Sequence, residues 1–114
     1  MTLNDSHCHF LSEHFFETLG REKYTGTESR SAAEIAHEIG MDPPGAAEAL
    51  ADRWVAELDQ HHVSRAALIA SVGGDEASVT AAVRRHPGRF VGFFALNAAA
   101  PDALPRATEA FTEF

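Results

Sequence analysis

The sequence predicts an α/β fold in which three strands alternate with helices and form a parallel sheet. Residues 66–71 and 90–96 are nearly continuous apolar runs, as is typical of strands that are buried on both faces of a parallel sheet. Residues 75–86, between these runs, have the pattern of an amphipathic helix, so the three segments form a β-α-β unit with a right-handed crossover. Another strand is expected at residues 2–7, with Leu3 as its apolar anchor.

A long excursion at residues 10–45 follows the first predicted strand. We expect one short helix within it, which begins at a capping box formed by Ser31 and Glu34 and stops at Gly40. Residues 41–45 (Met-Asp-Pro-Pro-Gly) form a rigid turn before the next helix. Loops of this length in compact domains are usually functional or disordered.

The helix expected at residues 46–61 presents one apolar stripe to the core. Five residues carry this stripe at the spacing of one helix face: Ala47, Leu50, Ala51, Trp54 and Leu58.

The helix expected at residues 75–86 has signals at both of its ends. Asp75 is expected to cap its N-terminus, and Pro87-Gly88 ends it. One face of this helix holds the residues that would pack on the sheet: Val79, Ala82, Val83 and His86.

A last helix is expected to begin within residues 101–105 and to present Leu104, Ala107, Phe111 and Phe114 on one face. No covering element follows these two phenylalanines. We therefore expect residues 1–114 to be the N-terminal part of one larger domain, truncated within its third helix. The open strand edge and the uncovered apolar surface predict that the chain alone folds poorly or self-associates, for example as a homo-oligomer.

The composition excludes several classes of partner. The net charge of −8, from 9 basic and 17 acidic residues, argues against nucleic acid and an anionic membrane surface. Cys8 is the single cysteine, so no intramolecular disulfide can form. The N-terminus lacks the pattern of a signal peptide, and the most apolar stretch, 90–100, is too short to span a bilayer. These observations indicate a cytoplasmic protein with no nucleic-acid or membrane partner.

Asp5-Ser6-His7-Cys8-His9 carries the main chemical signal. Side chains alternate along an extended strand, so Asp5, His7 and His9 are expected to share one face, with Cys8 as a small buried residue on the other. Two adjacent imidazoles make half of a tetrahedral metal site, and Asp5 could orient one of them from the second shell. The alternatives are a polar tail with two solvated histidines and an ordinary strand-end aspartate.

Three segments resemble a known family. Asp5-Ser6-His7-Cys8-His9-Phe10 is similar to the first-strand D-x-H-x-H element of the amidohydrolase superfamily. Residues 64–71 (SRAALIAS) and 86–93 (HPGRFVGF) resemble the amidohydrolase-related branch, which includes the aminocarboxymuconate-semialdehyde-decarboxylase-like enzymes. The H-P-x-R-F-x-G pattern is the more specific match. This resemblance implies the first three β/α units of a (β/α)8 TIM barrel, about 40% of a typical one.

The resemblance implies a metal-dependent hydrolase that acts on a small organic acid or amide-like substrate with a metal-activated water, or a decarboxylase (carboxy-lyase) of the same branch. It implies a mononuclear divalent metal, usually Zn²⁺, with His7 and His9 as the first-strand ligands. The other ligands, a His and an Asp, and a catalytic His lie on later strands in that family. No catalytic residue is therefore assigned here, and the chain alone is expected to be inactive. The alternative of another class is a non-catalytic truncated α/β module.

Residues near the mouth of such a barrel are candidates for a substrate pocket. Phe10 and Asn97 are assigned to it, and Ser71 lies at a comparable strand end. The aromatic residues of the first loop either line this pocket or form a hydrophobic cluster that anchors the loop. The aromatic residues of this loop are Phe10, Phe15, Phe16 and Tyr24, and His14 lies among them.

Overall fold

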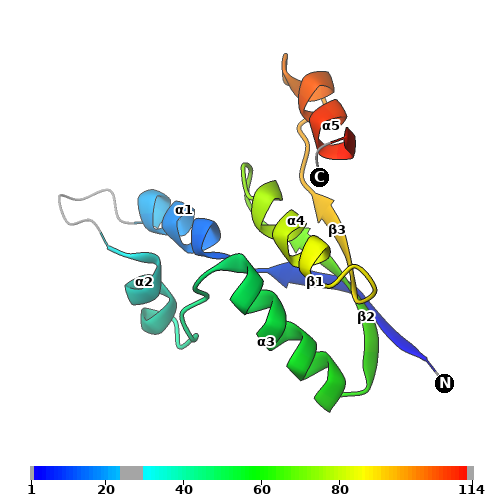
Figure 1. Cartoon of the computed structure of the whole chain (residues 1–114). Helices are drawn as coiled ribbons and strands as arrows, with labels where there is room; N and C mark the ends of the chain where they lie inside the picture. Colours follow the sequence, from blue (N-terminus) through cyan, green and yellow to red (C-terminus); the bar gives the residue numbers. More distant parts are fainter. Residues whose placement is uncertain (1, 24–29, 113–114) are drawn as a thin grey trace.

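A three-stranded parallel sheet is the centre of the structure, a computed structural model that describes residues 2–23 and 30–112. Its strands are β1 (Leu3–Phe10), β2 (Val63–Ala70) and β3 (Phe90–Phe94), and they lie in the order β1-β2-β3 (Figure 1). The described helices are α1 (Glu13–Lys23), α2 (Ala32–Glu38), α3 (Ala47–Gln60), α4 (Glu76–Arg85) and α5 (Ala103–Thr112). The predicted α/β class with a parallel sheet is confirmed.

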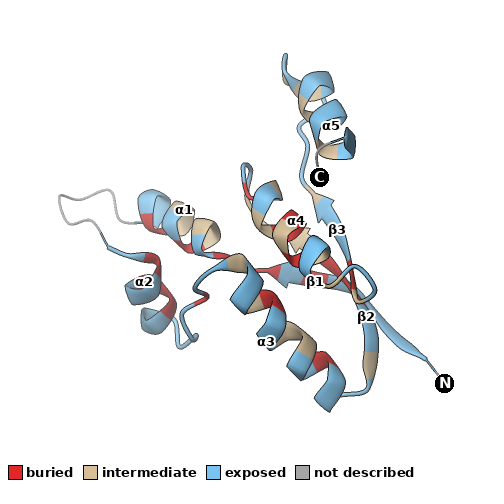
Figure 2. Cartoon of the chain, in the orientation of Figure 1, coloured by how far each residue is buried: buried red, intermediate tan, exposed pale blue. Residues whose placement is uncertain are grey.

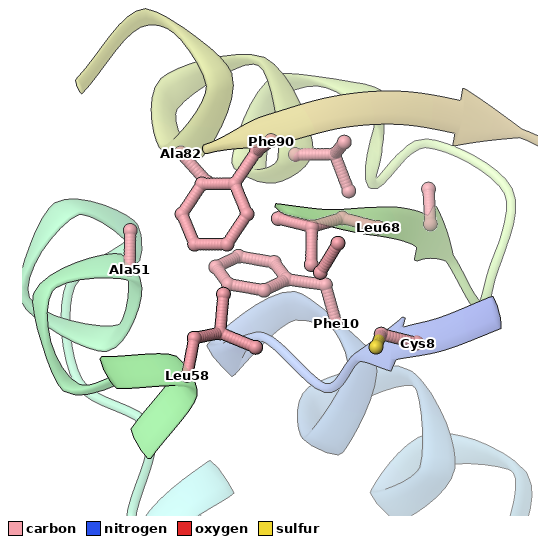
Figure 3. Packing of buried hydrophobic residues seen from close by; sticks show 10 residues of the cluster. Cys8, Phe10, Ala51, Leu58, Leu68, Ala82 and Phe90 are labelled. Atoms are coloured by element: carbon pink, nitrogen blue, oxygen red, sulfur yellow. The ribbon is translucent and has the colours of Figure 1, made fainter. Parts of the chain in front are cut away.

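Helices α3 and α4 pack side by side on the same face of the sheet (Figure 1). Between these helices and the strands lies the main core, in which Phe10 is surrounded by Leu58, Leu68 and Phe90 (Figure 3). The apolar stripes predicted for α3 and α4 contribute to this core, as expected. The opposite face of the sheet stays open within the described residues.

The open face is most evident on β3, which is coloured largely as exposed (Figure 2). Val91 and Phe93 of this strand are 52% and 54% exposed. The apolar run of β3 predicted burial on both faces, but only Phe90 is fully buried, and Phe94 packs against the edge of the core. Because the helices cover one face only, Val91 and Phe93 on the other face remain accessible, whereas Ala67 of the central strand β2 is buried.

Several predicted boundaries need correction. Strand β1 continues to Phe10, three residues beyond the expected end, and β2 begins at Val63 rather than residue 66. Strand β3 ends at Phe94, before residue 96. The excursion at residues 10–45 is not a loop with one short helix, because α1 also forms within it.

The helices α1 and α2 pack on each other and form a second hydrophobic cluster. Phe16 and Ile35 are buried there, and Phe15 packs against them. This contact supports the anchoring alternative for the loop aromatics, whereas Tyr24 lies outside the described residues. The capping box at Ser31 is confirmed, since the Ser31 hydroxyl accepts the Glu34 N–H and the Glu34 carboxylate accepts the Ser31 N–H.

The H-P-x-R-F segment joins α4 to β3 at the N-terminal ends of the strands. Arg89 donates hydrogen bonds to the carbonyl oxygens of Ser64 (2.8 Å) and Val63 (3.1 Å) and forms an ion pair with Asp59 (2.8 Å). These contacts tie the start of β3 to the start of β2 and the end of α3. The H-P-x-R-F segment, which is the more specific match to the family, therefore has a structural role. It lies at the N-terminal ends of the strands, whereas the predicted site lies at their C-terminal ends.

Helix α5 follows β3 and has no buried residue (Figure 2). Arg106 on α5 donates to the Glu76 carboxylate of α4 at 2.5 Å, while Leu104 and Phe111 stay exposed. The Cα radius of gyration is 15.1 Å, larger than the value of about 13 Å typical of a compact domain of this length. None of the described helices combines the length and apolar character needed to span a membrane.

The close packing of β3 on α4 predicts the effect of a small substitution. A Cβ atom added at Gly92 would lie 2.7 Å from Cγ1 of Val79 and 3.4 Å from Cγ2 of Val83. We expect Gly92→Ala to lower the free energy of unfolding by about 1–3 kcal/mol, because the two elements must move apart. Gly88→Ala is the control, since an added Cβ there meets nothing within 4 Å. Urea unfolding at a fixed chain concentration measures both, and equal midpoints would contradict this packing.

Candidate metal site

His7 and His9 lie together on the open face of the sheet, near the C-terminal end of β1. Both side chains are exposed, and His9 is in register with Ile69 of β2. Their Nε2 atoms are 3.2 Å apart, and the ring centroids are separated by 5.0 Å at an interplanar angle of 71°. The structure thus brings the two predicted ligands together, and the atoms that lie close to each other are the Nε2 nitrogens of the two rings.

The separation of these nitrogen atoms suits a divalent metal. Zinc binds histidine nitrogen at about 2.0–2.1 Å with tetrahedral geometry, so two such ligands lie about 3.3 Å from each other. The observed Nε2 to Nε2 distance of 3.2 Å matches that edge. Imidazole is also the ligand type that zinc and other borderline metals prefer. The donor pair therefore fits two positions of a tetrahedral site.

The described residues provide no third ligand at this position. No group of three or more His, Cys, Asp or Glu side chains in residues 2–23 and 30–112 could hold a metal ion together. A catalytic zinc site needs three protein ligands and one open position. The pair of His7 and His9 is thus an incomplete site.

Asp5 does not share the face of the two histidines. It pairs with Ala66, whereas Cys8 pairs with Leu68, so β1 has one more residue than β2 between these pairs. Such a β-bulge reverses the alternation of side chains and puts Asp5 in phase with Cys8. The expectation that Asp5 lies beside the imidazoles is therefore wrong.

The Asp5 carboxylate bonds to its own strand instead of to an imidazole. Its Oδ1 accepts the backbone N–H of His7 at 2.9 Å. This hydrogen bond, together with one from the Cys8 thiol, lowers the pKa of Asp5. Asp5 therefore stabilises the bulge through the His7 main chain. Among the described residues, no hydrogen bond joins the Asp5 carboxylate to either imidazole.

Cys8 is buried on the helix-covered face, as predicted, with 7% of its surface exposed (Figure 3). Burial, and secondarily the hydrogen bond to the Asp5 carboxylate, raises the pKa of Cys8 to about 12. The thiolate is the form of cysteine that binds metal. Cys8 is therefore a packing residue and not a ligand.

The two predicted pocket residues have different outcomes. Phe10 does not line a pocket, because β1 extends as far as Phe10 and directs its ring into the core, where it is fully buried (Figure 3). Asn97 lies three residues beyond β3 and is exposed, with its Oδ1 accepting the Ala99 N–H at 3.1 Å. Its side chain orders a local turn, and its role in a pocket stays a prediction.

Two polar contacts near these strand ends are predicted weakly or not at all by the sequence. Ser71, directly after β2, places its Oγ 3.0 Å from Nδ1 of His9. Asp75 was expected to cap α4 but makes no capping hydrogen bond; its buried carboxylate accepts the Ser12 hydroxyl at 2.7 Å. This buried pair joins the segment after β1 to the segment after β2. A lone serine and aspartate 63 positions apart give no sequence pattern that would reveal it.

Comparison with known proteins adds no relative: no protein-family model, curated protein or solved structure matches this chain.

The position of Cys8 predicts how its thiol reacts. We expect a thiol-specific disulfide reagent at pH 8.5 to modify Cys8 at least about tenfold more slowly in the native chain than in urea, because the native thiol is buried and protonated. The unfolded chain is the control for intrinsic reactivity, and near-ultraviolet circular dichroism of Trp54 shows that the native sample is folded. Equal rates in a folded sample would place Cys8 on the open face and would overturn the assignment of His7 and His9 to that face.

Proposed function

We propose that this chain is part of a metal-dependent enzyme of the amidohydrolase-related type, with His7 and His9 as ligands of a divalent metal, most readily Zn²⁺. The observation that carries the proposal is the 3.2 Å separation of the two Nε2 atoms on an accessible sheet face. This distance fits two positions of a tetrahedral zinc site. The resemblance in residues 5–10, 64–71 and 86–93 supports the same assignment.

The arrangement of strands and helices supports a barrel as the parent architecture. Sequential strands lie next to each other in the order β1-β2-β3, and α3 and α4 cover the same face. In a (β/α)8 barrel every helix lies outside the strands and the other face lines the interior, with the active site at the C-terminal ends of the strands. In this proposal, the open face of the sheet is the inner face, and His7 and His9 point into the barrel.

The chemistry of the site follows from its imidazole nitrogen atoms and from the apolar side chains on the same face of the sheet. A bound zinc ion supplies Lewis acidity, which activates water or polarises a carbonyl group near neutral pH. His7 and His9 hold two corners of the site, and Val91 and Phe93 on the same face of the sheet offer apolar surface. We propose a small organic acid or an amide-like compound as the substrate, with hydrolysis as the reaction.

Decarboxylation is the alternative reaction, since the family branch that the chain resembles contains both kinds of enzyme. A candidate from another class is a non-catalytic α/β module that associates with a second copy or another chain. The observation in its favour is the exposed apolar surface of Val91 and Phe93 beside the unpaired edge of β3. Metal dependence separates the two classes, because the module needs no metal.

A zinc titration tests the proposed ligands. We expect the chain to bind one zinc ion weakly, with a dissociation constant above about 1 μM, because two imidazoles are half of a tetrahedral ligand set. The double variant His7→Ala, His9→Ala should lose this binding in isothermal titration calorimetry at neutral pH. The matched control is His37→Ala, His61→Ala, which removes two exposed histidines elsewhere. Tight stoichiometric binding that survives the His7 and His9 changes would contradict the assignment.

The incomplete ligand set also predicts the activity of the chain by itself. We expect no zinc-dependent hydrolysis or decarboxylation by the purified 114-residue chain, since an open sheet cannot exclude water from a bound substrate. Hydrolysis of simple esters and amides and release of carbon dioxide from aromatic carboxylic acids are suitable assays. Turnover that needs zinc and disappears in His7→Ala would contradict this expectation and would show that the 114-residue chain is active through a site that needs His7.

A further inference from the structure

Ser71 is placed by the sheet to meet His9. It follows the last residue of β2 and is partly buried. His9 pairs in register with Ile69, and Ser71 lies two residues further along β2, on the same face as Ile69. The parallel pairing thus brings the Ser71 Oγ within 3.0 Å of the His9 Nδ1, across 62 positions of sequence.

A second, longer contact of the same hydroxyl group is compatible with one direction for this hydrogen bond. The Ser71 Oγ–H donates to the Ile69 carbonyl oxygen at 3.4 Å. A serine hydroxyl has one proton to donate and two lone pairs that accept. When its proton points toward Ile69, the Ser71 oxygen is able to accept the Nδ1–H of His9.

An Nδ1 proton leaves the Nε2 of a neutral imidazole with a free lone pair. The Nε2 of His9 is the atom that lies 3.2 Å from the Nε2 of His7. In the metal-free chain, the Nε2–H of His7 is then the donor to this lone pair. In this arrangement His9 has the tautomer that binds a metal through Nε2, and His7 alone must transfer its proton to Nδ1 before it can bind.

We propose that Ser71 is a positioning residue that keeps His9 in its Nδ1-protonated tautomer and directs Nε2 toward the metal position. The proposal rests on the metal site proposed above for His7 and His9. Histidine ligands commonly donate their second N–H to an oxygen acceptor, and loss of that acceptor weakens metal affinity by about 10–100-fold. Here the acceptor is a hydroxyl group from the neighbouring strand, in place of the carboxylate expected from Asp5.

Three variants and two measurements test this role. Ser71→Ala removes the acceptor, Ser71→Thr retains a hydroxyl group, and Ser64→Ala is the control at the far end of the same strand. The tautomer of His9 is measured in each metal-free chain by ¹⁵N NMR of the imidazole nitrogens. The zinc affinity of each full-length chain is measured by calorimetry, and Trp54 circular dichroism checks the fold.

We expect the Nδ1–H tautomer of His9 to predominate in the parent chain, in Ser64→Ala and in Ser71→Thr, and to lose its dominance in Ser71→Ala. Zinc affinity should fall about tenfold in Ser71→Ala only. An unchanged tautomer and an unchanged affinity in Ser71→Ala would overturn the positioning role and leave the metal site intact. If the parent chain does not bind zinc through His7 and His9, the metal site and the role of Ser71 toward it are both overturned. This holds even if the NMR spectra show the hydrogen bond between Ser71 and His9.

Discussion

Coverage of the sheet on one face by α3 and α4 determines which side of β1 is buried and which side stays accessible. Because side chains alternate along β1, the residues that face these helices, Cys8 and Phe10, enter the core, and His7 and His9 stay accessible. The burial of Phe10 therefore also orients the imidazoles. Loss of packing on the helix side would remove the constraint that holds the two histidines on a common face.

Much of the fold could be predicted from the sequence because its signals are local. The apolar stripe of α3, the end of α4 before Pro87 and the capping box at Ser31 depend on spacings of a few residues. Helix α1 could not be found in this way. Gly20 disfavours a helix interior, and its place in α1 is explained by close contact with the Ile35 side chain, which leaves no room for a Cβ atom.

The candidate site was predictable only in part, since pairing between strands decides the remainder. The alternating positions of His7 and His9 are visible in the sequence, but the bulge that turns Asp5 away depends on the register with β2. Ser71 likewise reaches His9 only through that register, and a single serine after an apolar run is not a signal for such a contact. The hydroxyl group of Ser71 thus takes the place that the sequence suggested for a carboxylate.

In the function that we propose, His7 and His9 present their Nε2 atoms to one metal position on the open face of the sheet. Anomalous diffraction at the zinc absorption edge, from crystals of the chain soaked with zinc, tests it most directly. We expect a peak about 2.0–2.1 Å from both Nε2 atoms, with Ser71 in contact with Nδ1 of His9. A zinc peak at other side chains, with His7 and His9 unliganded, or no peak at this position, would contradict it.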